Sequence, residues 1–341
     1  MKNTNNSVKN QPSYWVLLFA LLVGATMQAK VYNYVGAYAN VGEWTLLPTK
    51  SAYGPSFGVN GGIGAMYELQ AGKKYSQTRF LLNVGVGLNG GLTSFIQGSN
   101  VTQALANQYD LDGDLFDYMY EMKNRHDRYT DLALNVPLMI GVQHKKFYML
   151  AGVKMYSHLM TRSHSSATVN TYGRYAQFDE FRNMPEYQFF TGLSKTDAVN
   201  TKFKLDFDLS LEIGGRLGLV TDAVGYDVPK RNVEYRLAGF VDYGLTDLHY
   251  TDTKQALIVP DKYDTNPASP NYVYNGKSMI DNLKMNDIMA TTGFASKVSN
   301  LIVGLKFTVL FQLPEPGQCV ICRDAYRNSS VHRRGGVKYE E

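Results

Sequence analysis

The segment KFKLDFDLSLEIGGRLGLV, residues 202–220, alternates charged and apolar side chains. The charged positions are Lys204, Asp206, Asp208, Glu212 and Arg216, and the apolar ones are Phe203, Leu205, Phe207, Leu209, Leu211, Ile213 and Leu217. A period of two predicts a β-strand, because successive side chains of a strand point to opposite faces. The alternation runs well past the five or six residues that are usual for a strand of a soluble protein. The segment therefore indicates a long strand with one apolar and one charged face.

Seven further segments alternate in a similar way and predict seven more strands. They span residues 32–44, 56–69, 79–92, 130–143, 147–160, 234–246 and 300–312. The polar face of the first of these segments cannot be assigned from the pattern, whereas the polar faces of the others combine glycine with polar or ionisable side chains. Eight long alternating strands favour an all-β protein.

The composition is compatible with a membrane barrel but does not select it. The chain has 25 Tyr against 2 Trp, together with 31 Gly. Tyr-rich and Gly-rich chains of average hydrophobicity suit outer-membrane barrels, whose aromatic side chains lie at the two water interfaces. A secreted β-rich protein would fit the composition equally well. The formal charge of +4 is small and no basic tract stands out, so nucleic-acid binding has no support.

The first 29 residues have the organisation of a secretory signal peptide. Lys2 and Lys9 precede an apolar core at 14–29, and cleavage could follow Ala25 or Ala29. The apolar run is shorter than the roughly 20 residues that span a bilayer as a helix. We therefore expect an exported protein whose mature chain would reside in a membrane only as a β-barrel.

The lengths of the connections predict the topology. Short or medium links join the second and third, fourth and fifth, and sixth and seventh strands, whereas residues 93–129, 161–201 and 247–299 form long links. Outer-membrane barrels have short periplasmic turns and long extracellular loops. Hydrocarbon cannot satisfy backbone hydrogen bonds, so a sheet within it must close, with its apolar face outward. Residues 30–312 thus predict an eight-stranded antiparallel transmembrane up-and-down β-barrel with long extracellular loops and both termini in the periplasm. A lipocalin-like soluble barrel explains the loop asymmetry less well.

At this point the chain resembles the PorT-like outer-membrane β-barrel family of the Bacteroidota, within the wider group of small OmpA-like barrels. The resemblance rests on the stretches GPSFGVNGGIGAMYEL, RFLLNVGVGLNGG, LNVPLMIGV, KFYMLAGVK and VGLKFTVLFQLP. It implies insertion into the outer membrane by the barrel-assembly machinery. The residues implied as its recognition signal are Gly304, Phe307, Val309 and Phe311. The departure is that the last strand is not C-terminal, since a tail at 313–341 follows.

Three motifs could carry other chemistry. Cys319 and Cys322 form a CxxC in the tail, for which a disulfide is favoured over a metal or redox role in an oxidising periplasm. Asp110, Asp112, Asp114 and Glu121 have the spacing of a calcium loop, but Leu115 occupies the glycine position, and an acidic solvated loop is the alternative. His158 with Asp206 or Asp208 could serve a barrel hydrolase, although no serine accompanies them at a recognisable spacing.

The inward charges predict the function most directly. Nearly balanced charge in a narrow eight-stranded barrel favours paired side chains that fill the interior. The predicted network comprises Arg79, Lys154, Asp206, Asp208, Glu212, Arg216, Arg236, Asp242 and Lys306, with Glu68 and Glu234 also on inward positions. We expect a non-enzymatic outer-membrane barrel without a cofactor that anchors surface loops or binds a cell-envelope protein partner. A transport or protein-secretion component is the first alternative, and a lipid or peptide hydrolase the second.

Overall fold

The computed structural model describes residues 30–51, 53–72, 76–96, 100–109, 113–176, 180–181, 189, 191–201, 203–221, 227–229, 232–251, 254, 256–260 and 283–314. The predicted signal peptide, the tail with Cys319 and Cys322, and the residues Asp110 and Asp112 lie outside this part of the chain. No helix within the described residues combines the length and the apolar character needed to cross a bilayer.

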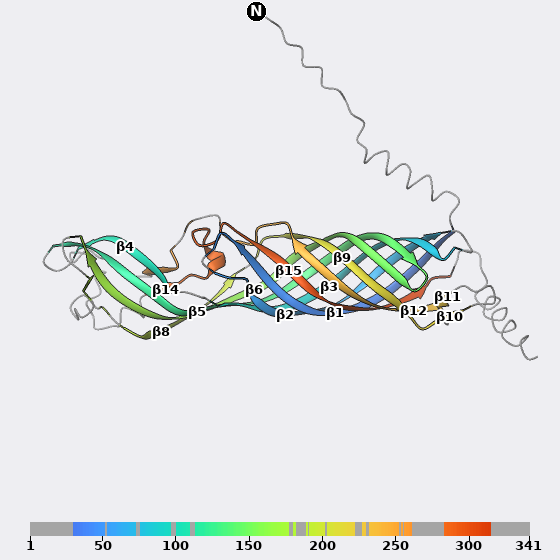
Figure 1. Ribbon diagram of the computed structural model, residues 1–341, viewed down its shortest axis with the longest axis horizontal. Coiled ribbons are helices and arrows are strands. Elements are labelled where there is room, and N and C mark those ends of the chain that lie inside the picture. The colour runs from blue at the N-terminus through green and yellow to red at the C-terminus, as the bar shows by residue number, and fades with distance from the viewer. Residues whose placement is uncertain are drawn as a thin grey trace, which may run out of the picture.

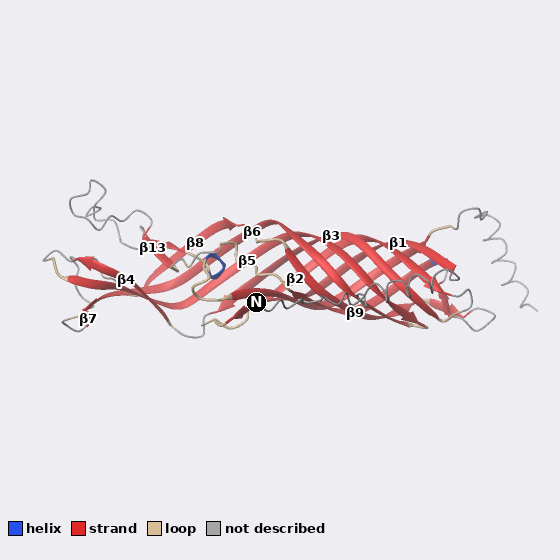
Figure 2. Cartoon of the chain, turned by 90° about the horizontal axis from the view of Figure 1, so that it is seen from above, coloured by secondary structure: helices blue, strands red, loops and turns tan. Residues whose placement is uncertain are grey.

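Eight antiparallel strands form a closed ring (Figures 1 and 2). In order around the ring they are β1 (Lys30–Thr49), β2 (Phe57–Gly72), β3 (Thr78–Ile96), β5 (Leu115–His144), β6 (Phe147–Tyr175), β9 (Asp206–Leu217), β12 (Val233–Gly244) and β15 (Lys297–Gln312). Strand β15 pairs with both β12 and β1, which closes the ring. The prediction of an all-β fold with eight antiparallel strands is confirmed.

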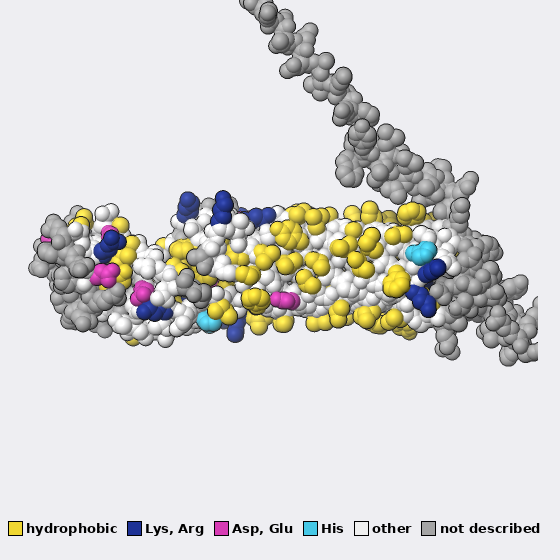
Figure 3. Space-filling model, in the orientation of Figure 1, with side chains coloured by type: hydrophobic (Ala, Val, Ile, Leu, Met, Phe, Trp, Pro, Cys, Tyr) yellow, Lys and Arg dark blue, Asp and Glu magenta, His cyan; other side chains and the backbone are white. Residues whose placement is uncertain are grey.

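The ring exposes apolar side chains and buries charged ones. Along β9, Phe207, Leu209, Leu211 and Ile213 are exposed, whereas Asp206, Asp208 and Glu212 are buried. The same alternation holds on β12 and β15. Figure 3 shows hydrophobic side chains spread over the ring, with Lys and Arg near its two ends. The ring thus has the reverse of the polarity of a soluble barrel, whose apolar face would point inward.

The alternation predicted at the start of the opening segment is wrong. Strand β9 begins at Asp206, and the residues before it do not continue its pattern. Phe203 is buried and Lys204 is exposed, the opposite of the prediction. The ring of Phe203 lies 5.7 Å from that of Tyr129 and 5.3 Å from that of His158. Phe203 therefore belongs to the covered mouth of the ring and not to its outer face.

Two of the predicted long loops are largely strands. Strand β5 is 30 residues long and β6 is 29 residues long, so both run far past the other strands. Their extensions pair with each other, with β4 (Val101–Tyr109) on one edge and with β8 (Leu193–Thr201) and β7 (Glu180–Phe181) on the other. We call this four-stranded sheet of β4, β8 and the extensions of β5 and β6 the projecting sheet; it extends beyond one end of the ring (Figure 1). The expectation of loops at 93–129 and 161–201 is corrected accordingly.

Two irregularities in β5 and β6 separate the ring from the projecting sheet. At Asn124, which has a positive φ of 50°, β5 has one extra residue, so that two of its residues lie opposite one residue of β6. A second shift lies opposite Leu132, where Leu159 and Met160 of β6 are both exposed. Each extra residue reverses which alternate positions point inward. The sequence pattern appeared to end there, because a search for unbroken alternation stops at a bulge.

The mouth of the ring on the side of the projecting sheet is covered by the described parts of the chain between β12 and β15. This chain includes β13 (Ile258–Pro260), β14 (Leu283–Met285) and the 3₁₀ helix η4 (Ile288–Ala290). Ile288, Met289 and Leu248 are buried there in one cluster with Trp44, Phe95 and Tyr129. At the opposite end of the ring lie the start of β1 and the end of β15, which pair with each other. The hairpin of β10 (Leu219–Thr221) and β11 (Asp227–Pro229) also lies at that end (Figure 1).

Candidate functional site

The interior of the ring holds its densest charge cluster at the end where the described chain begins and ends. Arg236 on β12 contacts Glu68 on β2, with Nη2 2.7 Å from Oε1 and Nη1 2.8 Å from Oε2. Its Nε donates to Glu234 at 2.6 Å, and Nη2 of Arg216 donates to the other oxygen of Glu234 at 2.7 Å. All four side chains are buried. Two cations and two carboxylates thus neutralise one another in a single layer.

Two further ion pairs lie nearer the middle of the ring. Lys306 Nζ is 2.8 Å from Glu212, whose second oxygen accepts a bond from the Tyr148 hydroxyl at 2.6 Å. Lys154 Nζ lies 2.8 Å from both oxygens of Asp242. Tyr156 and Ser210 also donate to Asp242, at 3.1 and 2.6 Å. Both pairs are therefore completed by hydroxyl donors, as buried ions require.

Some of these contacts cross the interior, whereas others, such as that of Arg216 on β9 with Glu234 on β12, join neighbouring strands along the wall. Strand β12, which carries Arg236, is separated from β2 and its Glu68 by β15 and β1. Lys154 on β6 reaches Asp242 across β9, and the Tyr38 hydroxyl on β1 reaches Asn135 on β5 at 3.0 Å. Each of these crossing bonds joins strands that are not neighbours. The side chains consequently bridge the ring from wall to wall.

Three of the predicted charges form no ion pair with another described residue. The Nη1 of Arg79 donates to the neutral Gln70 at 3.0 Å. Asp206 accepts from Thr246, and Asp208 accepts from Asn300 at 3.0 Å. Each of these two aspartates also has one oxygen without a partner among the described residues. The predicted network therefore has two parts. Its ion pairs lie in the middle of the ring and toward the end where β1 starts, whereas Asp206 and Asp208, near the covered mouth, have neutral hydrogen-bond partners.

His158 does not contact the aspartates with which the sequence grouped it. Its Nδ1 lies 2.7 Å from Asp131, whose other oxygen accepts a bond from Thr161 at 2.6 Å. The other ring nitrogen, Nε2, is buried and has no partner within the described part of the chain. The edge-on ring of Phe203 covers the imidazole. Among the described residues no hydroxyl or thiol is hydrogen-bonded to His158, which favours a packing role.

A second buried polar cluster fixes the chain that covers the mouth. Arg125 contacts Asp127 through two nitrogens, at 3.1 and 3.0 Å, and also donates to the carbonyl of Asn286. Asp287 accepts from the hydroxyls of Tyr129 and Tyr250, at 2.9 and 2.6 Å. Its Oδ1 also accepts from the N–H groups of η4. Burial, and then the negative charge of Asp127, raises the pKa of Asp287.

Buried His249 and half-buried Asp247 form a second pair of this kind. Nδ1 of His249 lies 2.7 Å from Asp247, which also accepts from the backbone N–H of Val298 at 3.0 Å. Burial alone would raise the pKa of Asp247, but the hydrogen bonds from Val298 and His249 lower it. Covering chain and ring are thus joined by charged groups as well as by apolar contacts.

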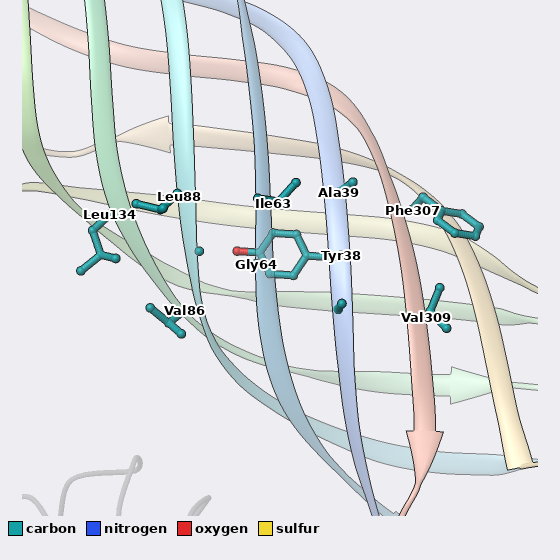
Figure 4. Close-up of a pocket in the computed structure, with 11 residues that line it drawn as sticks. Tyr38, Ala39, Ile63, Gly64, Val86, Leu88, Leu134, Phe307 and Val309 are labelled. Carbon is teal, nitrogen blue, oxygen red and sulfur yellow. The ribbon is translucent and has the colours of Figure 1, made fainter.

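Inward glycines make room for a tyrosine that spans part of the interior. In Figure 4 the ring of Tyr38 lies across Gly64. A Cβ on Gly64 would lie 2.5 Å from that ring, and one on Gly87 would lie 2.2 Å from its hydroxyl. On the outside these small residues leave a shallow apolar hollow of 680 Å³. The glycines that recur on the polar faces in the sequence therefore have a packing role.

The remaining predicted sites have different positions. Phe307 and Phe311 point outward from β15, whereas Gly304 is on an inward position. A Cβ added to Gly304 would lie 2.3 Å from the carbonyl oxygen of Val41, so no larger residue fits there. Glu121 lies within β5 and accepts from Asn170 at 3.1 Å, so it is part of a strand and not of a calcium loop. Among the described residues no three His, Cys, Asp or Glu side chains gather as metal ligands would.

Sequence reasoning missed the hydroxyl and amide partners of the buried charges. Tyr148, Tyr156 and Gln143 all contact charged side chains of the network. Each occupies a position of the inward alternation, so the period could have identified them. Neither family models nor curated proteins match this chain.

Proposed function

We propose that the chain is an outer-membrane β-barrel protein whose ring spans the bilayer. The observation that carries this proposal is the exposed apolar surface of the ring around a charged interior. Exposed positions such as Ile63, Leu138 and Leu305 would be costly in water, since no apolar patch of this extent is usual on a soluble monomer. Hydrocarbon removes this cost and requires closed backbone pairing, which the ring provides.

The filled interior favours an anchoring role over a channel. Eight strands enclose a space just wide enough for side chains, and here the ion pairs of Arg236, Lys154 and Lys306 occupy it. The covering chain at the mouth adds a second obstruction. We infer a non-enzymatic protein that holds the projecting sheet outside the cell, where a cell-envelope partner can reach it.

Biogenesis and topology follow from the same proposal. The barrel-assembly machinery would insert the ring, with the outward Phe307, Val309 and Phe311 of β15 as its recognition signal. The short turns and both chain termini would lie in the periplasm, and the projecting sheet would lie outside. Outer-membrane lipid is then the principal partner of the outer surface.

Two measurements test the proposal. Samples in detergent should migrate differently on a gel before and after boiling, because a closed ring resists detergent until it is heated. External protease on intact cells should cleave within 247–299, while an epitope placed after Phe311 stays protected. Recovery of the protein in the soluble periplasmic fraction would overturn the membrane location.

A transport or protein-secretion component is the alternative, and conductance distinguishes it. The purified protein in planar bilayers should show little ion current if the paired charges fill the interior. Large and stable open-channel currents would favour transport instead. A hydrolase is less favoured, because His158 pairs with Asp131 under the ring of Phe203.

A further inference from the structure

A compact basic patch lies on the outer surface where the ring meets the projecting sheet. Arg128 on β5 is directly opposite His164 on β6, and Arg162 is diagonal to Arg128 through its own pairing with Thr130. His126 is the next exposed position on β5. All four side chains are exposed on one face. We call Arg128, Arg162, His126 and His164 the basic patch.

The two guanidinium groups of the patch have no counter-ion in the described part of the chain. Neither the Arg128 nor the Arg162 side chain makes a hydrogen bond or ion pair with another described residue. The nearby carboxylates, Asp127 and Asp131, point inward and are buried on Arg125, His158 and Thr161. Diagonal side chains of neighbouring strands lie within reach of long side chains. Two like charges this close repel, and an anion between them would remove the repulsion.

The strands on either side of the patch add neutral, small residues. Ser94 on β3 pairs with Arg128, whereas Asn200 and Ala198 on β8 pair with Arg162 and His164. These side chains leave room above the sheet and can donate hydrogen bonds through Ser94 and Asn200. A guanidinium pair with such donors suits the oxygens of a phosphate group.

The patch also borders the apolar surface of the ring. Below the row of Thr130 and Arg162, the next pair in the sheet is Leu132 and Met160, which are 38% and 63% exposed. Leu159 beside them is 52% exposed. A molecule bound here would thus meet cations at its head and hydrocarbon along its length. Figure 3 shows Lys and Arg near this end of the apolar surface.

From these contacts we propose that the basic patch binds the phosphate-bearing head of an outer-leaflet membrane lipid, with its acyl chains on Leu132, Leu159 and Met160. This inference rests on the proposed membrane location of the ring. It adds a specific lipid site to that function, on one side of the ring and at one level. Basic side chains near a membrane surface attract anionic lipid with roughly 1 kcal/mol each.

The test is a binding titration of the full chain in neutral detergent micelles with lipid A that carries two phosphates. The double variant Arg128→Gln/Arg162→Gln should bind roughly 25-fold more weakly, about fivefold for each cation. The control is Lys145→Asn/Lys146→Gln, which removes the same charge from exposed positions at the opposite end of the ring. This control should bind as the unchanged protein does.

Ligand arms identify what the patch recognises. Lipid A without its phosphates should bind weakly and equally to all three proteins. Inorganic phosphate and inositol hexakisphosphate should compete poorly, because they lack acyl chains. Competition by either at concentrations comparable to the lipid would overturn the lipid assignment in favour of a soluble anion. Equal affinity of the double variant and the unchanged protein for phosphorylated lipid A would overturn the site.

Folding is measured separately, so that weaker lipid binding can be assigned either to the lost cations or to a misfolded ring. Each variant should keep the heat-dependent gel shift expected of a closed ring. A shift retained together with unchanged lipid affinity would reject the lipid site alone. Loss of the shift in the unchanged protein would instead reject the membrane barrel, and the lipid site with it.

Discussion

The ring and the projecting sheet share two strands but have opposite polarity. Where β5 belongs to the ring, Leu132, Leu138 and Ile140 are exposed and Asn135 is buried. Where the same strand belongs to the projecting sheet, Phe116, Tyr118, Tyr120 and Met122 are buried. Whether a strand exposes apolar or polar side chains depends on the medium that its outer face contacts. The difference is the one expected if the ring lies in an apolar medium and the projecting sheet in water, as the proposed membrane location requires.

The strongest test of the inverted interior is the removal of one buried cation. Arg236→Ala would leave Glu68 without a cation and Glu234 with Arg216 alone. An uncompensated buried charge costs about 3–5 kcal/mol, so the free energy of unfolding should fall by about that amount. Urea unfolding of the reconstituted protein, followed by Trp fluorescence, measures it. Lys146→Ala, at an exposed position, should change it by less than about 0.5 kcal/mol. An unchanged Arg236→Ala midpoint would mean that water screens the interior.

The contrast between the outer surfaces of the ring and of the projecting sheet can be measured by introducing an arginine into each. Leu211→Arg, on the exposed face of β9, should destabilise the protein by about 2–4 kcal/mol in a bilayer. Ala104→Arg, at an exposed position of β4, should change stability by less than about 0.5 kcal/mol, because water already surrounds it. Urea unfolding in lipid vesicles compares the two. Equal effects would contradict the assignment of different media.

The covering chain is held to the ring by the hydrogen bond from Tyr129 to Asp287. Tyr129→Phe removes the donor to Asp287 and should weaken local closure by about 1.5–3 kcal/mol, the usual range for bonds to charged groups. Hydrogen exchange of the segment 285–290 should become faster, whereas exchange in β12 should not change. Tyr235→Phe, on an exposed position of the ring, is the matched control and should leave both rates as they are.

The smallest expected effect is a pH dependence confined to the covering chain. The pKa of Asp287 is raised in the folded state, so its protonated form is favoured there. The stability that this contributes is fully present below the unfolded value of 3.8 and is lost as the pH rises through the folded value. Exchange of 285–290, corrected for its intrinsic rate, should speed up by at most about tenfold per pH unit in that window. Asp287→Asn should remove the dependence, and a dependence that survives would implicate another group.

The sequence by itself determined the eight strands of the ring and, for all but the first of them, which face is apolar. It did so because exposed and interior positions alternate, as between Leu209 and Asp208 or between Phe307 and Lys306. The spacing alone could not show that β5 and β6 continue past the ring, since bulges near Asn124 and Leu159 interrupt the period. A pattern of period two carries no information across such an interruption.

Only the tertiary structure decided which charges meet. Glu68 and Arg236 are 168 positions apart in the chain and contact each other because the stagger of the strands brings them to one level. The same stagger leaves Asp206 and Asp208 near the mouth, beside Thr246 and Asn300 and outside the ion pairs of the described residues. It also brings Arg128 and Arg162 together on the outside. Alternation determines the face of a side chain, whereas strand register determines its height, and an ion pair requires both.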